Sequence, residues 1–342
     1  MPVQEEIVGF CSSLAILVHS KDQRSGKEIR ELRLAHFSVK EYLTSNLVEN
    51  GLRNYFKETI ARASIANVCL AYLIHLDQKF LANEVRESFP FAQYCAQYWM
   101  THAVAGEEDE TLQELMRDFF LRRKWAYHNC YQLYDPDTPW RVGYNDNVVT
   151  NPLAELYYAS LVGLHSAVQM LLDQGANVNV QSGKYGNALQ AASSEGHEQI
   201  AKLLLKNGAD VSVRGGYYGN ALQAASSKGH EQIVKLLLDK GADVNIHVRN
   251  NALYAASSEG HEQIVKLLLN KGANAQGGLH SSPLQAALSK GHEQIVKLLL
   301  DKGADANSQG GEYGSALQEA LYRGYEQMAK LLLDRGADVN AQ

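Results

Sequence analysis

The stretch GHEQIVKLLL occurs three times in this sequence without a change, at residues 229–238, 260–269 and 291–300. A near copy, GHEQIAKLLL, stands at 196–205, and weaker copies stand at 163–172 and 324–333. The glycines that open the six copies are separated by 33, 33, 31, 31 and 33 residues. A nearly constant period of this size is typical of short structural units that stack into a row.

Each unit contains two predicted helices. In the copy at 196–205, Ile200, Leu203 and Leu204 follow the i, i+3, i+4 spacing of one apolar helix face. A shorter helix precedes it at 188–196, and Gly196 is expected to end that helix in a left-handed turn. Asn and Ser are good N-caps. The first helices are therefore expected to begin after Asn151, Asn187, Asn220, Asn251, Ser282 and Ser315.

One such unit is too small to bury its own apolar face, so neighbouring units must stack into a solenoid with a continuous core. With openings such as NALQAA and SPLQAA and the ending LLLDKGADVN, residues 151–342 resemble six ankyrin repeats. The resemblance implies an α-solenoid that binds other proteins. The units depart from the family's TPLH opening, and the usual hydrogen bond of its histidine is in question. The residues predicted at that position are Glu155, Gln190, Gln223, Tyr254, Gln285 and Gln318.

The first half of the chain has no such period. Residues 15–20 and 29–38 read as two strands around a charged turn, with helices before and after them. The predicted fold class is mostly α, with four parts in order. They are a winged-helix-like unit with a short β-hairpin at 1–60, a helical bundle at 61–124, a linker at 125–150 and the solenoid at 151–342.

Several stretches of this half carry a second resemblance. ELRLAHFSVKEYL at 31–43, CLAYLIHLD at 69–77, AQYWMTHA at 96–103 and LYDPDTPW at 133–140 resemble the winged-helix and helical region of fungal NACHT-ankyrin signalling proteins. In that family, this region follows a nucleotide-binding ATPase module. The resemblance implies a regulatory, ligand-sensing portion of such a signalling protein, in which the N-terminal domain relays occupancy of the repeats.

Motifs for catalysis are missing from the sequence. A phosphate-binding loop needs GxxxxGK[ST], but Gly26-Lys27 is followed by Glu28 and Gly183-Lys184 by Tyr185. A GxSxG elbow for a serine nucleophile is also absent. We therefore expect no enzyme activity, no catalytic residues, no cofactor and no bound nucleotide in this chain.

The histidines and cysteines give no clear metal or catalytic site. His197, His230, His261 and His292 recur in register, but stacked helices lie roughly 8–10 Å apart while zinc needs its ligands at about 2.0–2.1 Å. We expect structural histidines and no metal. His128 with Cys130 is a possible catalytic pair, but no third orienting group can be identified for it.

Charge and apolar patterning bear on partners and location. The chain has 32 Lys and Arg against 38 Asp and Glu, so a nucleic-acid partner is not expected. The apolar segments 7–18 and 65–76 are shorter than the roughly 20 residues that cross a bilayer, so no membrane association is expected. Cys11, Cys69, Cys95 and Cys130 form no CxxC pair, which favours reduced thiols in the cytoplasm, or alternatively in the nucleus.

The loops between units vary while the helices are copied, so the loops are the candidate binding surface. Exposed tyrosine and arginine side chains are common hot spots in protein interfaces. The predicted partner-binding residues are Tyr185, Tyr217, Tyr218, His247, Arg249, His280 and Tyr313. The predicted function is a non-catalytic scaffold for an unknown protein partner. The alternatives are a stand-alone ankyrin adaptor or decoy, or a DNA-associated regulator that uses the winged helix.

The last copy keeps an ordinary apolar stripe, where a terminal repeat needs a polar outer face. Either further repeats follow it, or the chain is a shortened relative. We predict that the helices of this last copy fray first on heating, because they have a neighbour on one side only. Hydrogen exchange measures this directly, and equal protection of the last and the central copies would contradict it.

Overall fold

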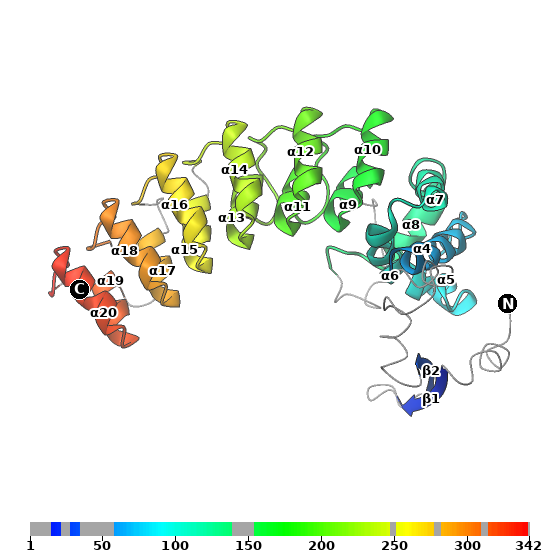
Figure 1. Ribbon diagram of the computed structural model, residues 1–342, viewed down its shortest axis with the longest axis horizontal. Helices are drawn as coiled ribbons and strands as arrows, with labels where there is room; N and C mark the ends of the chain where they lie inside the picture. Colours follow the sequence, from blue (N-terminus) through cyan, green and yellow to red (C-terminus); the bar gives the residue numbers. More distant parts are fainter. Residues whose placement is uncertain are drawn as a thin grey trace, which may run out of the picture.

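In the described residues between 154 and 340, twelve helices form six pairs that stand side by side in a curved row (Figure 1). The computed structural model describes residues 15–21, 28–34, 58–138, 154–246, 251–276, 282–308 and 314–340. The inner helices are α9 (Glu155–Val162), α11 (Ala188–Glu195), α13 (Ala221–Lys228), α15 (Ala252–Glu259), α17 (Pro283–Lys290) and α19 (Ala316–Tyr322). The outer helices are α10 (His165–Asp173), α12 (Glu198–Lys206), α14 (Glu231–Asp239), α16 (Glu262–Asn270), α18 (Glu293–Asp301) and α20 (Glu326–Asp334).

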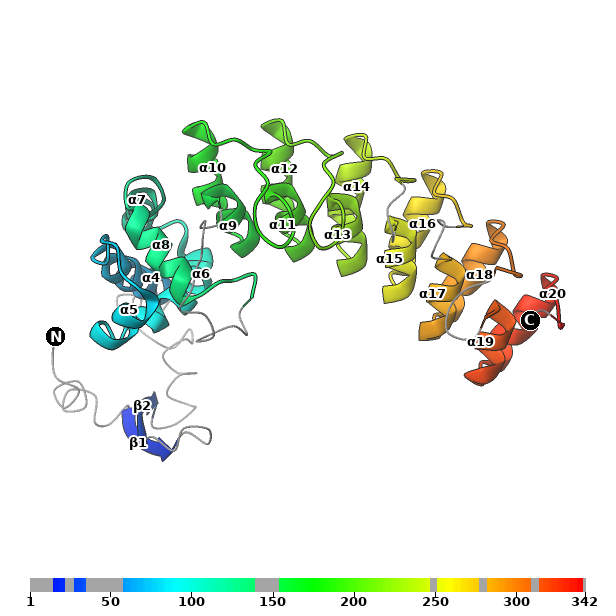
Figure 2. The same ribbon diagram turned by 180° about the vertical axis from the view of Figure 1, so that it is seen from behind.

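Successive inner helices pack more extensively against each other than successive outer helices do. Their small side chains allow this close approach, and Ala191 and Ala192 of α11 are completely buried. The row therefore bends, with the inner helices along its concave side (Figures 1 and 2). The outer helices contribute the larger apolar residues, such as Ile200 and Leu204 of α12, to the same core.

The predicted caps are present in five of the six units. The side chains of Asn187, Asn220, Asn251, Ser282 and Ser315 each accept a backbone N–H in the first turn of their helix. Gly196 ends α11 in the left-handed region at φ 82°. The next unit's His230 ring lies so close that a methyl group at Gly196 would be 2.5 Å from it. This glycine is needed both for its backbone angle and for the space.

The prediction for the first unit was wrong in register. Its inner helix α9 begins at Glu155 with Ala154 as N-cap, and Asn151 lies outside the described residues. Tyr157 lies six residues before Gly163, as Gln190 lies six residues before Gly196. Tyr157, and not Glu155, therefore takes the place of the family's histidine. The first turn of α9 has no side-chain cap, and the Ala154 N–H donates to the Ser182 hydroxyl at 2.9 Å.

The histidines in register are links between units. The Nε2 atom of His230 lies 3.0 Å from the backbone oxygen of Ser194 in the preceding inner helix. His197, His261 and His292 make the same contact at 3.1 Å with Leu161, Ser227 and Ser258. Glutamine also links the units. Gln190 donates to the Gly215 carbonyl and Gln285 to the Ser308 carbonyl, both at 3.0 Å, so a hydrogen bond is made where the family's histidine is replaced.

Amide side chains form a second set of links between units. Asn245 donates to the Gly272 carbonyl at 2.9 Å and accepts the Asn274 N–H at 2.8 Å. The same pair of bonds links Asn179, Gln276 and Asn307 to the unit that follows each of them. The second unit carries Ser212 at this position, and its shorter side chain donates to Asp210 of its own loop at 2.7 Å. The seam between the second and third units thus lacks this bridge.

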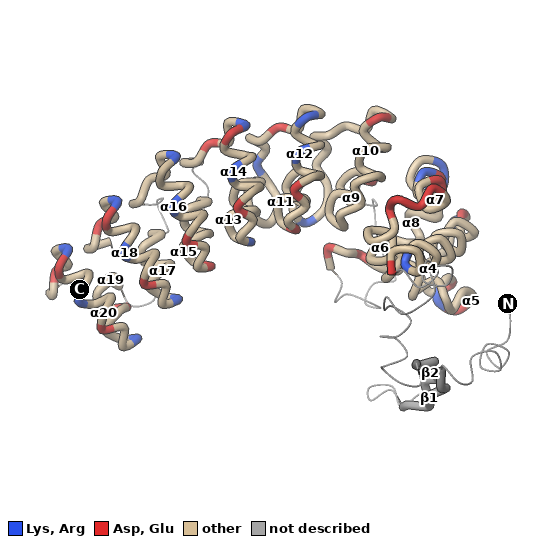
Figure 3. Tube along the Cα trace, in the orientation of Figure 1, with Lys and Arg blue, Asp and Glu red and all other residues tan. Residues whose placement is uncertain are grey.

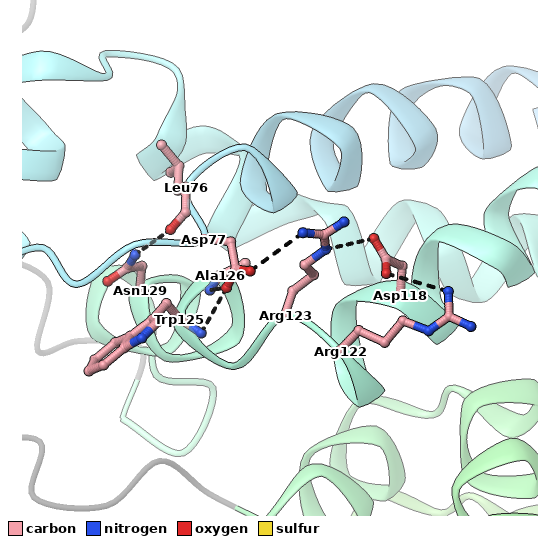
Figure 4. A network of polar contacts seen from close by, with 8 residues as sticks. All are labelled: Leu76, Asp77, Asp118, Arg122, Arg123, Trp125, Ala126 and Asn129. Atoms are coloured by element: carbon pink, nitrogen blue, oxygen red, sulfur yellow. Dashed lines mark hydrogen bonds and ion pairs between the residues drawn. The ribbon is translucent and has the colours of Figure 1, made fainter.

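The helical bundle comprises α4 (Glu58–Ile74), α5 (Ala82–Ser88), α6 (Ala92–Gly106), α7 (Glu110–Leu121) and α8 (Lys124–Leu133). Helix α8 begins at Lys124 and continues to Leu133, in the segment 125–150 that the sequence predicts to be a linker. Asp77 fixes its start by accepting the N–H groups of Trp125 and Ala126 at 3.1 and 3.2 Å (Figure 4). Asn129 donates to the backbone oxygen of Leu76 at 2.7 Å. These bonds attach α8 to the end of α4.

The bundle packs against the first repeat. The rings of Phe120 and Tyr127 lie 6.3 and 5.6 Å from the ring of the buried Tyr158 on α9. Glu107, in the turn after α6, accepts the N–H groups of His165 and Ser166 at 3.2 and 3.1 Å, at the start of α10. A carboxylate is favourable at a helix N-terminus. The bundle therefore covers the first end of the solenoid with both apolar and polar contacts.

Residues 15–21 and 28–34 form the strands β1 (Ala15–Lys21) and β2 (Glu28–Leu34), which pair antiparallel with Ala15 opposite Leu34. A winged helix also needs helices packed on such a hairpin. The residues that would form those helices, 1–14 and 35–57, lie outside the described residues. The winged-helix prediction is therefore not supported by the structure.

We predict that Ser212→Asn stabilises the chain, because it restores the missing bridge between the second and third units. One added hydrogen bond is worth about 0.5–1.5 kcal/mol, and urea unfolding measures the gain. Asn245→Ser is the matched control and should lose a similar amount. If Ser212→Asn leaves the free energy of unfolding unchanged while Asn245→Ser lowers it, the seam between the second and third units cannot form the bridge.

We predict that acid weakens the fold partly through His197. Burial lowers the pKa of His197, so the folded chain binds fewer protons than the unfolded chain below about pH 6.5. This contribution to stability is complete above that pH and is lost as the pH falls. His197→Gln keeps an N–H donor for Leu161 but does not titrate. Its unfolding free energy should fall less between pH 7.5 and 5.5 than that of the unchanged chain, and equal losses would contradict the assignment.

Candidate functional site

Two loop tips at the start of the solenoid form one continuous surface. The first tip, residues 182–186 (SGKYG), precedes α11, and the second tip, residues 215–219 (GGYYG), precedes α13. Each tip is closed by its own backbone hydrogen bond, from Ser182 to Gly186 at 2.7 Å and from Gly215 to Gly219 at 2.9 Å. The N–H of Tyr217 donates to the Lys184 carbonyl at 2.9 Å, which joins the two tips.

The two tips touch because the second tip has a glycine at the point of contact. A methyl group at Gly216 would overlap the carbonyl group of Tyr185, and Gly216 has a left-handed φ of 66°. Only glycine allows both the backbone angle and the contact without strain. The sequence GG at 215–216 thus sets the distance between the tips.

Three predicted residues meet on this surface. The rings of Tyr185 and Tyr218 stack at 5.8 Å with 11° between their planes, and Tyr217 packs edge-on against Tyr218 at 4.9 Å. Tyr217 is 69% exposed, while Tyr185 and Tyr218 are half-buried. Burial raises the pKa of Tyr185 to about 12, so its hydroxyl stays protonated at neutral pH.

Lys184 completes the cluster and was missed by the sequence analysis. Its ammonium group lies 5.3 Å from the centre of the Tyr185 ring and 5.0 Å from that of Tyr217. A cation within about 6 Å of an aromatic face is attracted to it. The position could have been found from the sequence, because Lys184 in SGKYG corresponds to Tyr217 in GGYYG when the tips are aligned.

Four other predicted binding residues, His247, Arg249, His280 and Tyr313, lie outside the described residues. They stay predictions. The ends of the inner helices carry Glu195, Lys228, Glu259 and Lys290 at corresponding positions, followed by Arg323. Both signs of charge are therefore interspersed along the repeats (Figure 3). This pattern does not select a purely acidic or purely basic partner.

The possible catalytic pair is not assembled. Burial raises the pKa of Cys130 to about 12, which opposes the thiolate that a nucleophile needs. His128 lies two residues away on α8, so the two side chains do not share a helix face. Its Nε2 atom lies 2.6 Å from the Gln132 amide. In the part of the chain that the structure describes, no three His, Cys, Asp or Glu side chains converge as a metal site would require.

Among the described helices, none combines the length and the apolar character that a membrane crossing requires.

The comparison with family models agrees with the repeat architecture. A family model for ankyrin repeats (3 copies) matches residues 156–248, 218–277 and 252–342. Azaphilone pigments biosynthesis cluster protein L of Monascus ruber is 36% identical over 213 residues. That alignment covers 58% of this chain and 44% of the relative, so the chain spans less than half of that relative's length. The crystal structure of the human ASB11 ankyrin repeat domain matches at 28% identity with a TM-score of 0.49, covering 55% of this chain and 86% of that one.

Proposed function

The chain belongs to the ankyrin repeat family, and from this premise we propose that it is a non-catalytic protein-interaction scaffold that binds its partner through the first and second tips. The observation that carries the proposal is the tyrosine cluster itself. It presents one exposed ring, Tyr217, on a base of two half-buried rings. Tyrosine is enriched among the residues that dominate interface energies, because it offers a large apolar area with a polar end.

The rigidity of the tips supports this choice of surface. Each tip is closed by a backbone bond, and the two are joined through Lys184 and Tyr217. Ordering a flexible loop on binding costs free energy for each immobilised side chain. A surface that is already ordered avoids most of that cost. Less of the binding free energy that the Tyr217 contacts provide is therefore offset by the cost of ordering the loop.

The broader context that we propose is the regulatory, ligand-sensing part of a NACHT-ankyrin signalling protein. Its support is the resemblance of residues 31–43 and of the bundle segments to that family. We also propose a cytoplasmic location, with the cysteines as support, and no nucleic-acid or nucleotide partner. In this proposal the bundle, which packs on the first repeat, would transmit the state of the repeats.

We predict that replacing Tyr217 and Tyr218 together with Ala weakens the complex with the cognate partner by about 2 kcal/mol or more, roughly a 30-fold rise in Kd. The unchanged chain is used as bait, and mass spectrometry identifies the captured proteins. The affinity of the strongest candidate is then measured for both forms of the chain.

Tyr322→Ala is the matched control, because Tyr322 is 70% exposed on α19 at the far end of the solenoid. Its affinity should equal that of the unchanged chain. Equal affinity of the double variant would remove the tips from the binding surface, and equal loss in both variants would indicate a general effect on the fold.

A further inference from the structure

A buried carboxylate outside the repeats contacts the first tip. Asp137 lies in the loop that leaves α8 and is only 6% exposed. One of its oxygens, Oδ2, accepts the backbone N–H of Lys184 at 2.7 Å. The hydroxyl of Tyr157 on α9 donates to Oδ1 at 2.8 Å and is 3.0 Å from Oδ2. The bundle's exit loop thus reaches the centre of the first tip.

The bond between Asp137 and Lys184 corresponds to a bond between the two tips. When the tips are aligned on Gly186 and Gly219, Lys184 corresponds to Tyr217. The N–H of Tyr217 donates to the Lys184 carbonyl, which belongs to the preceding tip. The N–H of Lys184 donates to Asp137 instead. A carboxylate of the bundle thus supplies the acceptor that a preceding tip supplies in the next repeat.

Tyr157 holds the same tip from below. Its hydroxyl oxygen accepts the N–H of Tyr185 at 3.2 Å while its O–H group donates to Asp137. A methyl group at Gly183 would overlap the Tyr157 ring, so the tip rests directly on this side chain. Consecutive N–H groups of the first tip, from Lys184 and Tyr185, are therefore held by Asp137 and Tyr157.

Asp137 is itself placed by its own loop. Asp135 accepts the N–H of Asp137 at 2.9 Å, and it accepts the Thr138 hydroxyl at 2.8 Å. Such bonds from an aspartate to the residues after it fix a local turn. The titratable groups near the carboxylate are Asp135 on its own loop, Tyr131 on α8, Tyr157 on α9 and Lys184 on the tip. Charge-assisted hydrogen bonds of this kind are shorter and stronger than neutral ones.

We propose that Asp137 is a positioning residue for the binding surface: by standing in for a preceding tip, it fixes the first tip and, through Lys184, the second. The inference deepens the proposed function and rests on it for its biological meaning. The bonds run from Asp137 to Lys184 and from Lys184 to Tyr217, whose ring is the exposed end of the cluster. A shift of the bundle's exit loop therefore moves the tyrosine surface.

The test uses the full chain with Asp137→Asn. Asparagine has the same shape but is uncharged and carries an NH2 group in place of one oxygen, so it loses one acceptor atom and the charge that strengthens the bonds to the Tyr157 O–H and the Lys184 N–H. We expect the amides of Lys184 and Tyr217 to exchange with solvent at least tenfold faster. In the NMR spectrum, the Lys184 amide proton should move upfield because its charge-assisted bond is lost. The amide of Leu204 in the core of α12 should be unchanged.

Two further variants keep the test decisive. Asp243→Asn makes the same change at a carboxylate that accepts the Asn245 N–H of its own loop, and it should leave both tips as they were. If Asp137→Asn fails to fold, Tyr157→Phe takes its place in the test. This variant lacks the hydroxyl that accepts the Tyr185 N–H, so the Tyr185 amide should exchange faster. Unchanged exchange and chemical shift at Lys184 in a folded Asp137→Asn chain would overturn the proposal.

Amide exchange and partner affinity, measured together, distinguish the positioning role of Asp137 from the proposed binding surface. If Asp137→Asn loosens the tips but the Tyr217 and Tyr218 double variant binds its partner normally, the positioning role stands and the proposed binding surface fails. If the double variant loses binding and Asp137→Asn changes neither exchange nor affinity, the binding surface stands and the positioning role fails.

Discussion

The close contact between successive inner helices is the constraint on which the rest of this structure depends. Inner helices with alanine at their contact positions bury those positions completely, as at Ala191 and Ala192. The left-handed glycines after them leave room for a histidine ring from the next unit, as Gly196 does for His230. Larger residues at either place would separate the units and expose their apolar stripes. The curvature of the row and the alignment of the tips both follow from this contact.

The repeats could be predicted because each of their local signals has a local cause. The capping side chains of Asn187 and Ser315, and the left-handed Gly196, act within one turn of a helix. The register of the first unit could not be predicted in this way. Asn151 is a good N-cap in isolation, but the spacing from Tyr157 to Gly163 decides where α9 begins. Counting back from the glycine would have given the correct start.

The candidate site could be predicted only in part. The tyrosines of the tips were found because loop residues vary while the helices are copied. The roles of Lys184 and Asp137 depend on contacts between segments that are far apart in the sequence. Asp137 lies 47 positions from Lys184, and nothing in its own neighbourhood indicates that its carboxylate is buried. Helix α8 was assigned to a linker for the same reason, since Asp77 and Asn129 fix it from outside its own sequence.

The seams between the central units share one histidine contact. His230, His261 and His292 each bond a serine carbonyl of the preceding inner helix, at 3.0, 3.1 and 3.1 Å. The three decapeptides that contain these histidines, at 229–238, 260–269 and 291–300, are identical. Recombination between such copies in a gene would add or remove one whole unit, and the new junction would have the contacts that the old junctions already had. The array can therefore gain or lose units in evolution without a change in the way that its core packs. The number of loop tips that it presents changes with the number of units.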